Sequence, residues 1–175
     1  MNNRDENLRQ QNKNSASNMT SDEKEAWTEG IIRNYAYGSL VIGLVPMPLI
    51  DLVALTGLQM KLIHKLSTFY GVPFSEERGK KIIASLFGAS VPLGLTRGVC
   101  SILKIVPIIG FTVSLLSTSV LSAASTYAIG KLFVRHFESG GTFLNFDVTK
   151  SRDYYEEQFK KGKTIAEGFK PPAKE

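Results

Sequence analysis

The feature that most constrains this chain is a stretch of 26 residues, Ile105 to Gly130, that contains no Lys, Arg, Asp, Glu or His. A helix needs ~20 predominantly apolar residues to cross the hydrocarbon core of a membrane, so the stretch is long enough. Pro107 and Gly110 break its start, which predicts a helix from about Phe111 to Phe137. Hydroxyl residues dilute the second half, as is common where membrane helices pack closely and in soluble cores alike. The stretch therefore predicts a buried helix, either in lipid or in protein.

A second apolar stretch, at residues 43–61, is interrupted by Pro46, Pro48 and Asp51. Proline disfavours helix in the residue before it, so the preceding helix is expected to end near Leu44. Asp51 stands directly before the next apolar stripe, where a carboxylate accepts hydrogen bonds from free backbone N–H groups. We therefore predict that Asp51 caps this helix. The alternative is a carboxylate at membrane depth that handles protons or cations, because charge is costly there and usually marks function.

Start and stop signals place the other helices. Thr20 and Glu23 have the spacing of a capping box, and an apolar stripe with helical period follows them. Gly71 is expected to close the helix after the second stretch, and Ser75 to cap the next one. A short helix is expected near Asp153–Lys163. Strand signals are weak throughout, so the predicted fold class is all-α, a bundle built from apolar helical hairpins.

The chain of 175 residues makes one domain with tails. Residues 1–19 are rich in Asn, Gln and Ser and contain no apolar core of a signal peptide, which predicts a disordered polar tail. Residues 20–148 form the predicted membrane-associated helical domain. Residues 149–175 form a basic-aromatic segment suited to a lipid interface, an acidic partner or a helix docked on the domain; it contains Tyr154, Tyr155, Phe159, Lys160, Lys161 and Lys163.

Composition and motifs narrow the function classes. The net charge of +5 is spread along the chain, so a nucleic-acid surface is not predicted, whereas an anionic membrane or an acidic partner protein suits it. Cys100 is the single cysteine, and the two histidines, His64 and His136, have no cysteine partner, so neither a disulfide nor a metal or other cofactor is predicted. Gly162-Lys163-Thr164 resembles the end of a phosphate-binding loop, but Glu157 stands where that motif needs glycine.

Charge does not orient the apolar blocks in a membrane. Basic residues flank both ends of every block, so that true spans would place basic clusters on both sides of the bilayer. Hairpins that enter and leave by one face, with the Val-Pro segments at their tips, would resolve this conflict, and so would a soluble bundle. We expect stable membrane association and leave spans and re-entrant hairpins as alternatives.

The stretch GLVPMPLIDLVALTGLQMKLIHKLSTFYGVPFSEE, followed later by YAIGKLFVRHFESGGTF, resembles a bacterial family catalogued as domain of unknown function 697. Its members include YcjF-like inner-membrane proteins and segments attached to small GTPase domains. The most specific part of the resemblance is Pro46-x-Pro48-x-x-Asp51, followed by Gln59, Lys61 and Tyr70-Gly71. The resemblance implies a helical module of the bacterial inner membrane that accompanies a GTPase and has no assigned catalytic residue.

Gln59 and Lys61 flank the apolar face of their helix, where a partner helix, lipid headgroups or plain solvent would meet them. We therefore predict a non-catalytic, membrane-associated accessory or scaffolding protein that binds lipid and acts with a GTPase in trans. A homo-oligomer and cytoplasmic termini are also expected. One alternative is a small channel or transporter subunit with Asp51 near its pore, and another is a soluble all-α adaptor. The predicted structural or interaction residues are Pro46, Pro48, Asp51, Gln59, Lys61, Tyr70, Gly71 and Pro107.

Overall fold

The computed structural model describes residues 10, 14, 16–42, 48–90 and 110–168. These residues form an all-helical bundle without strands, which confirms the predicted fold class for the described part of the chain. Its main helices are α2 (Ser21–Ile42), α3 (Pro48–Phe69), α4 (Glu76–Ser90), α6 (Gly110–Glu138) and α7 (Val148–Glu167).

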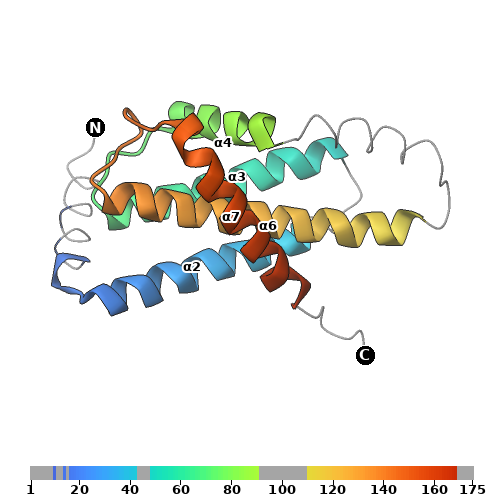
Figure 1. Ribbon diagram of the computed structural model, residues 1–175, viewed down its shortest axis with the longest axis horizontal. Coiled ribbons are helices and arrows are strands. Elements are labelled where there is room, and N and C mark those ends of the chain that lie inside the picture. The colour runs from blue at the N-terminus through green and yellow to red at the C-terminus, as the bar shows by residue number, and fades with distance from the viewer. Residues whose placement is uncertain (1–9, 11–13, 15, 43–47, 91–109, 169–175) are drawn as a thin grey trace.

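Helix direction alternates along the long axis of the bundle. Figure 1 shows α3 and α6 running against α2, α4 lying beside α3, and α7 crossing α6 obliquely. The last turns of α2 and α4 and the first turns of α3 and α6 consequently lie toward one end of the molecule (Figure 1). The first turns of α2 and α4 and the last turns of α3 and α6 lie toward the other.

Several helix ends are stabilised by the predicted capping motifs. The Thr20 backbone N–H donates to Glu23 Oε2 at 2.8 Å, and the Glu23 N–H donates to Thr20 Oγ1 at 3.3 Å, which makes the expected capping box. Gly71 has φ of 68° and closes α3: its N–H donates to the Thr68 carbonyl at 3.2 Å, and the next N–H donates to that of Ser67 at 2.8 Å. A left-handed glycine with this bond pair is a Schellman motif, and Gly140 ends α6 in the same way.

Two predicted helix starts need correction. α3 begins at Pro48, so Asp51 lies in its first turn and does not occupy the N-cap position. Proline suits the first helical position because its fixed φ is helical and its missing N–H would be unpaired there anyway. α7 runs from Val148 to Glu167, well beyond the expected Asp153–Lys163, because Asp147 caps it: Asp147 Oδ1 accepts from the N–H groups of Thr149 and Lys150 at 3.0 and 3.1 Å.

The core differs in composition along the bundle. An aromatic cluster fills the end where α3 and α6 finish; it consists of Trp27, Phe69, Phe74, Phe133, Phe137, Phe143 and Phe146. Toward the other end, from Ser119 to Ala128, the buried residues of α6 are small except for Tyr127. The small ones are Ser119, Ser122, Ala123, Ala124, Ser125, Thr126 and Ala128. Small side chains let neighbouring helices approach closely, and α2 and α7 pack on α6 there and along its middle.

Two glycines mark the tightest of these approaches. An added Cβ at Gly130 would lie 2.7 Å from Ile32 Cγ1 of α2. An added Cβ at Gly162 would lie 3.0 Å from the Ala124 backbone and from Tyr127 Cβ, both in α6. Gly162, which resembles part of a phosphate-binding motif in the sequence, is therefore a packing position on α7.

No helix within the described ranges combines the length and the apolar character that a membrane crossing requires.

Candidate functional site

Charge is divided between the two ends of the bundle. Four stretches form what we call the apolar end: residues 34–42 of α2, 48–60 of α3, 82–90 of α4 and 110–130 of α6. Asp51 is the single Asp, Glu, Lys or Arg among them. The other halves of the same helices form the charged end. Arg97 and Lys104 lie in the connection between α4 and α6, outside the described residues.

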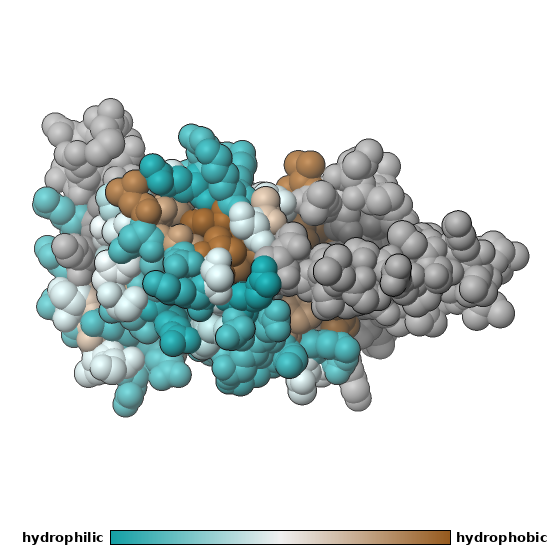
Figure 2. Space-filling view, turned by 45° about the horizontal axis from the view of Figure 1, so that its top comes forward, coloured by the Kyte–Doolittle hydropathy of each residue, from teal (hydrophilic) through white to brown (hydrophobic). Residues whose placement is uncertain are grey.

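The division follows from helix direction. α2 and α4 begin with their charged halves, whereas α3 and α6 finish with theirs. Because the direction alternates, all four charged halves meet at one end (Figure 1). Figure 2 shows hydrophilic residues over most of that end, with smaller hydrophobic areas between them.

Exposed apolar side chains are concentrated at the apolar end. Val41, Val53 and Leu121 are 56%, 74% and 47% exposed and belong to α2, α3 and α6. Leu144, also 74% exposed, lies instead in the loop after α6, at the charged end. Exposed large apolar residues that gather at one place indicate a surface that meets another apolar phase.

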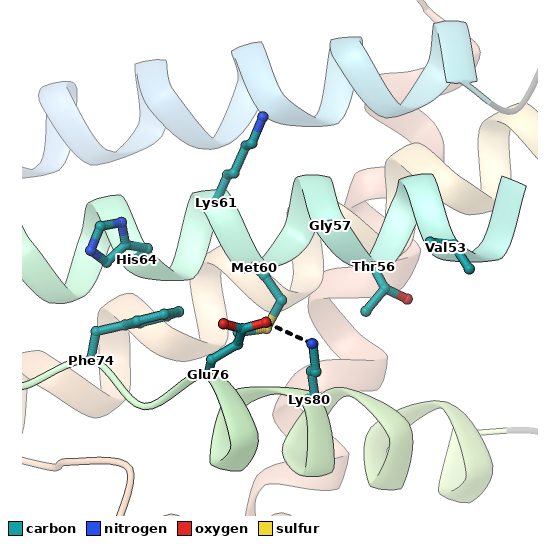
Figure 3. Close-up of a pocket in the computed structure, with 9 residues that line it drawn as sticks. All are labelled: Val53, Thr56, Gly57, Met60, Lys61, His64, Phe74, Glu76 and Lys80. Carbon is teal, nitrogen blue, oxygen red and sulfur yellow. Dashed lines mark ion pairs between the residues drawn. The ribbon is translucent and has the colours of Figure 1, made fainter. Parts of the chain in front are cut away.

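A groove of about 630 Å³ lies between α3 and α4 (Figure 3). Its lining residues are Val53, Thr56, Gly57, Met60, Lys61, His64, Phe74, Glu76 and Lys80. Met60 forms part of its wall and is 7% exposed; it packs against α4 where Gly79 leaves room, since an added Cβ there would lie 2.7 Å from Met60 Cε. The groove is therefore set by the close contact of the two helices beside it.

Charged groups stand along the mouth of the groove. Lys80 Nζ is 2.6 Å from Glu76 Oε1, and this ion pair holds the pKa of Glu76 below its usual value. Lys61 is exposed and extends from α3 on the side away from α4 (Figure 3). The His64 ring lies 4.5 Å from that of Phe74, between centroids. Lys61 thus has the exposure expected of an edge residue.

Gln59 differs from the prediction of an edge position, because it is fully buried. Its Nε2 donates to Ser125 Oγ and Thr126 Oγ1, both at 3.3 Å, and its Oε1 has no hydrogen-bond partner among the described residues. The Ser125 hydroxyl is also 3.2 Å from that of Tyr155, whose pKa is raised by burial. The contact that Gln59 makes with a helix is therefore internal, and it joins α3 to α6 and α7.

Tyr70 and Gly71 have structural roles at the charged end. The Tyr70 hydroxyl donates to Glu138 Oε1 at 2.8 Å, and burial together with this carboxylate raises the Tyr70 pKa. The bond connects the end of α3 to the end of α6, next to the Schellman motif at Gly71. Of the other predicted residues, Pro46 and Pro107 lie outside the described residues, and Pro48 and Asp51 are described only in their backbone.

The basic-aromatic segment is docked on the bundle. The Arg135 guanidinium lies over the Tyr154 ring, 4.3 Å from its centroid, and Tyr155 is 1% exposed. Lys161 pairs with Glu157 at 2.7 Å. Of the three alternatives for this segment, the helix docked on the domain is the one that the positions of Tyr154 and Tyr155 match. Sequence reasoning missed the packing roles of Gly130 and Gly162, because a glycine inside a helix does not reveal which neighbour approaches it.

The remaining chemistry-bearing residues are accounted for locally. His136 Nε2 is 2.9 Å from the Thr142 carbonyl oxygen, and Cys100 lies outside the described residues. In the part of the chain that the structure describes, no group of three or more His, Cys, Asp and Glu residues is placed to hold a metal ion.

The described fold defines a class of protein: an α-helical bundle with one charged end and one apolar end. The chain belongs to the family described as domain of unknown function 697, which matches residues 7–164 and confirms the predicted family. It is also 40% identical over 139 residues to Magnetosome membrane protein 22 of Magnetospirillum gryphiswaldense, an alignment that covers 79% of this chain and 71% of that protein. No solved structure matches the chain.

Proposed function

We propose that this chain is a non-catalytic, membrane-associated protein of bacteria that enters one face of the membrane with its apolar end. The observation that carries the proposal is the gathering at one end of the halves of α2, α3, α4 and α6 whose single charged residue is Asp51, with Val41, Val53 and Leu121 exposed there. The name of the similar magnetosome protein describes a membrane protein, which supports this setting.

Helix length supports entry from one face for α2, α3 and α4. The stretches 34–42 and 82–90 each contain nine residues, which as helix extend ~13 Å, less than half of a ~30 Å hydrocarbon core. These two stretches fit one leaflet, and the 13 residues of 48–60 extend ~20 Å, short of a full crossing. The 21 residues of 110–130 extend ~31 Å, so length favours entry from one face for α2, α3 and α4 and does not for α6. Entry from one face also resolves the conflict in the sequence, because the described basic residues of the four helices stay together on the aqueous side.

Packing at the apolar end supports the same setting. Where lipid surrounds helices, small residues and hydrogen bonds between helices hold them together, because apolar burial no longer favours association. The small residues of α6 and the bonds from Gln59 to Ser125 and Thr126 supply both.

We propose that such a protein acts in localisation or scaffolding. The family resemblance implies a GTPase partner in trans, and this partner stays a prediction. A homo-oligomer likewise stays a prediction. The channel alternative would place Asp51 near a pore. It predicts that Asp51→Asn abolishes ion flux in vesicles while helicity and vesicle binding are retained.

The proposal is tested with two exposed side chains that differ in position. Val53 and Leu144 are both 74% exposed, but Val53 lies at the apolar end and Leu144 at the charged end. An aspartate at membrane depth costs ~2.5–3.5 kcal/mol, so Val53→Asp is expected to lower vesicle partitioning by about a hundredfold. Leu144→Asp adds the same charge and is expected to change it less than about twofold.

The measurement is flotation of the full chain with phosphatidylcholine vesicles, with helicity checked by circular dichroism. Equal loss in the two variants would contradict the proposed orientation. Failure of the unchanged chain to float would overturn membrane association and favour the soluble adaptor.

A further inference from the structure

The groove between α3 and α4 changes in chemistry along its length. Val53 lies toward the apolar end, Gly57 and Met60 follow along α3, and Lys61 and His64 come last, toward the charged end (Figure 3). Its volume of about 630 Å³ is within the range of ~300–1,000 Å³ that is typical of ligand sites. An occupant that is apolar toward one end and polar toward the other would therefore match it.

One of the residues that line the groove is a glycine with open space beside it. A Cβ added at Gly57 would have no neighbour within 4 Å, although the residue lies in the middle of a helix. Glycine there weakens the helix relative to alanine by ~0.5–1 kcal/mol, and no backbone strain or helix contact requires it. The space that it leaves is available to a ligand.

The cations at the groove are weakly engaged. The side chains of Lys80 and Glu76 are 56% and 64% exposed, so their ion pair is of the surface kind that contributes little to stability. Among the described residues, no ion pair includes Lys61. Lys80 can exchange its exposed partner Glu76 for an anion at the mouth, and Lys61, which extends away from α4, reaches the mouth by a change of side-chain rotamer.

We propose that this groove binds one anionic phospholipid, with an acyl chain along Val53, Gly57 and Met60 and the phosphate at Lys61 and Lys80. The inference rests on the proposed function, since entry of the apolar end orients the groove with Val53 toward the hydrocarbon and Lys61 toward the headgroups. A phosphate matches Lys61 and can compete with Glu76 for the exposed Lys80, whereas the apolar helix of a second copy would leave Lys61 unmatched.

The test uses lipid that is soluble as single molecules, so that it does not depend on membrane insertion. Dihexanoyl phosphatidylglycerol, below its critical micelle concentration, is titrated into the full chain by isothermal calorimetry. Dihexanoyl phosphatidylcholine and glycerol 3-phosphate serve as probes for the headgroup charge and for the phosphate without acyl chains. Binding is expected for phosphatidylglycerol, at least about tenfold weaker binding for phosphatidylcholine, and none for glycerol 3-phosphate.

Gly57→Leu fills the groove and is expected to weaken phosphatidylglycerol binding about tenfold or more, because the new side chain takes the place of the acyl chain. Gly30→Leu is the matched control, since Gly30 is also an exposed helical glycine with no neighbour within 4 Å of an added Cβ, but lies in α2 outside the groove. Equal affinity in the two variants would overturn the proposal. So would a change in oligomeric state with Gly57→Leu while lipid affinity is retained, which would assign the groove to a second copy.

Lys61→Gln is expected to weaken phosphatidylglycerol binding about tenfold and phosphatidylcholine binding less, because the choline cation already offsets the charge of the phosphate there. Lys65→Gln removes an exposed charge one turn later on the same helix, outside the groove, and is expected to have less than about a twofold effect. If the unchanged chain floats with vesicles but binds no monomeric lipid, the groove assignment fails and the proposed function stands. If it binds the monomeric lipid but does not float, the proposed function fails, and with it the orientation assigned to the bound lipid.

Discussion

Gly162 packs so closely on the backbone of Ala124 that even a methyl group there has no space. At the residue scale, Gly162 is therefore the position where α7 contacts the backbone of α6. Gly57 is the opposite case, an exposed helical glycine with open space around it. The two sites differ only in their neighbours, so one substitution applied to both separates packing from helix propensity.

Gly162→Ala is expected to destabilise the protein by about 1–3 kcal/mol, because the added Cβ would lie 3.0 Å from atoms of the α6 backbone that cannot turn aside. Gly57→Ala is expected to stabilise it by about 0.5–1 kcal/mol through helix propensity. Urea unfolding followed by circular dichroism measures both. A stabilising Gly162→Ala would contradict the close contact between the helices.

Single residues also differ in how well the sequence predicts their roles. Gly71 could be predicted to close its helix, because left-handed backbone favours glycine whatever the surroundings. Gln59 could not be placed, since its burial depends on hydroxyls of Ser125 and Thr126, which lie 66 and 67 positions away in the chain. Lys61, two residues later, is exposed. Helical periodicity separates these two residues, which lie about 200° apart around α3, but it does not reveal which hydroxyl groups meet a buried polar side chain.

At the element scale, helix existence was predictable and helix starts were less so. The predicted helix Phe111–Phe137 is observed as Gly110–Glu138. The glycine at each limit, Gly110 at the start and Gly140 after the end, leaves little freedom in where the helix begins and ends. The prediction of Asp51 as the cap places the start of α3 too late, because Pro48 is already the first helical residue. α7 was predicted too short, because the cap at Asp147 was not considered.

The cap of α7 is expected to make this helix sensitive to acid. Hydrogen bonds from the N–H groups of Lys150 and Thr149 lower the pKa of Asp147 below its usual value of 3.8. A group whose pKa is lowered by folding contributes stability above its unfolded pKa, and that contribution is lost as the pH falls through the folded pKa. The first turn of α7 should therefore fray below about pH 4.

Amide hydrogen exchange at Thr149 and Lys150, followed by NMR from pH 6 to pH 3, measures this fraying after correction for the intrinsic pH dependence. Asp147→Asn keeps a capping oxygen that does not titrate and should remove the pH dependence. Asp147→Ala should show increased exchange at every pH. A pH dependence that persists in the asparagine variant would mean that another group titrates.

At the scale of the whole molecule, the division into a charged and an apolar end is a property of topology. Each helix sequence by itself shows only that one half lacks charge, apart from Asp51 in α3. The alternation of direction, visible in Figure 1, brings these halves together. The sequence could predict hairpins that meet a membrane from one face, but also spans and a soluble bundle, because all three share the same charge pattern.

Depth measurements along the bundle test this polarity directly. We expect a nitroxide at Val41, in the last turn of α2, to meet dissolved oxygen more often and a water-soluble nickel chelate less often when the protein binds vesicles. A nitroxide at Glu25, in the second turn of the same helix, should stay accessible to the chelate. Both labels are introduced as cysteines in a Cys100→Ser background and compared by electron paramagnetic resonance. Similar chelate accessibility at both positions would contradict insertion of one end.

The alternation of helix direction also limits how such a chain can grow. In each of the pairs α2 with α3 and α4 with α6, both helices have their charged half at the base of the hairpin. Their other halves, which face the connection, contain only one charged residue, Asp51. A further hairpin of this kind extends the bundle without disturbing its polarity, whereas a single added helix reverses the direction of every helix after it and carries their charges to the wrong end. Length variants that keep this architecture are therefore expected to gain or lose bundle helices in even numbers.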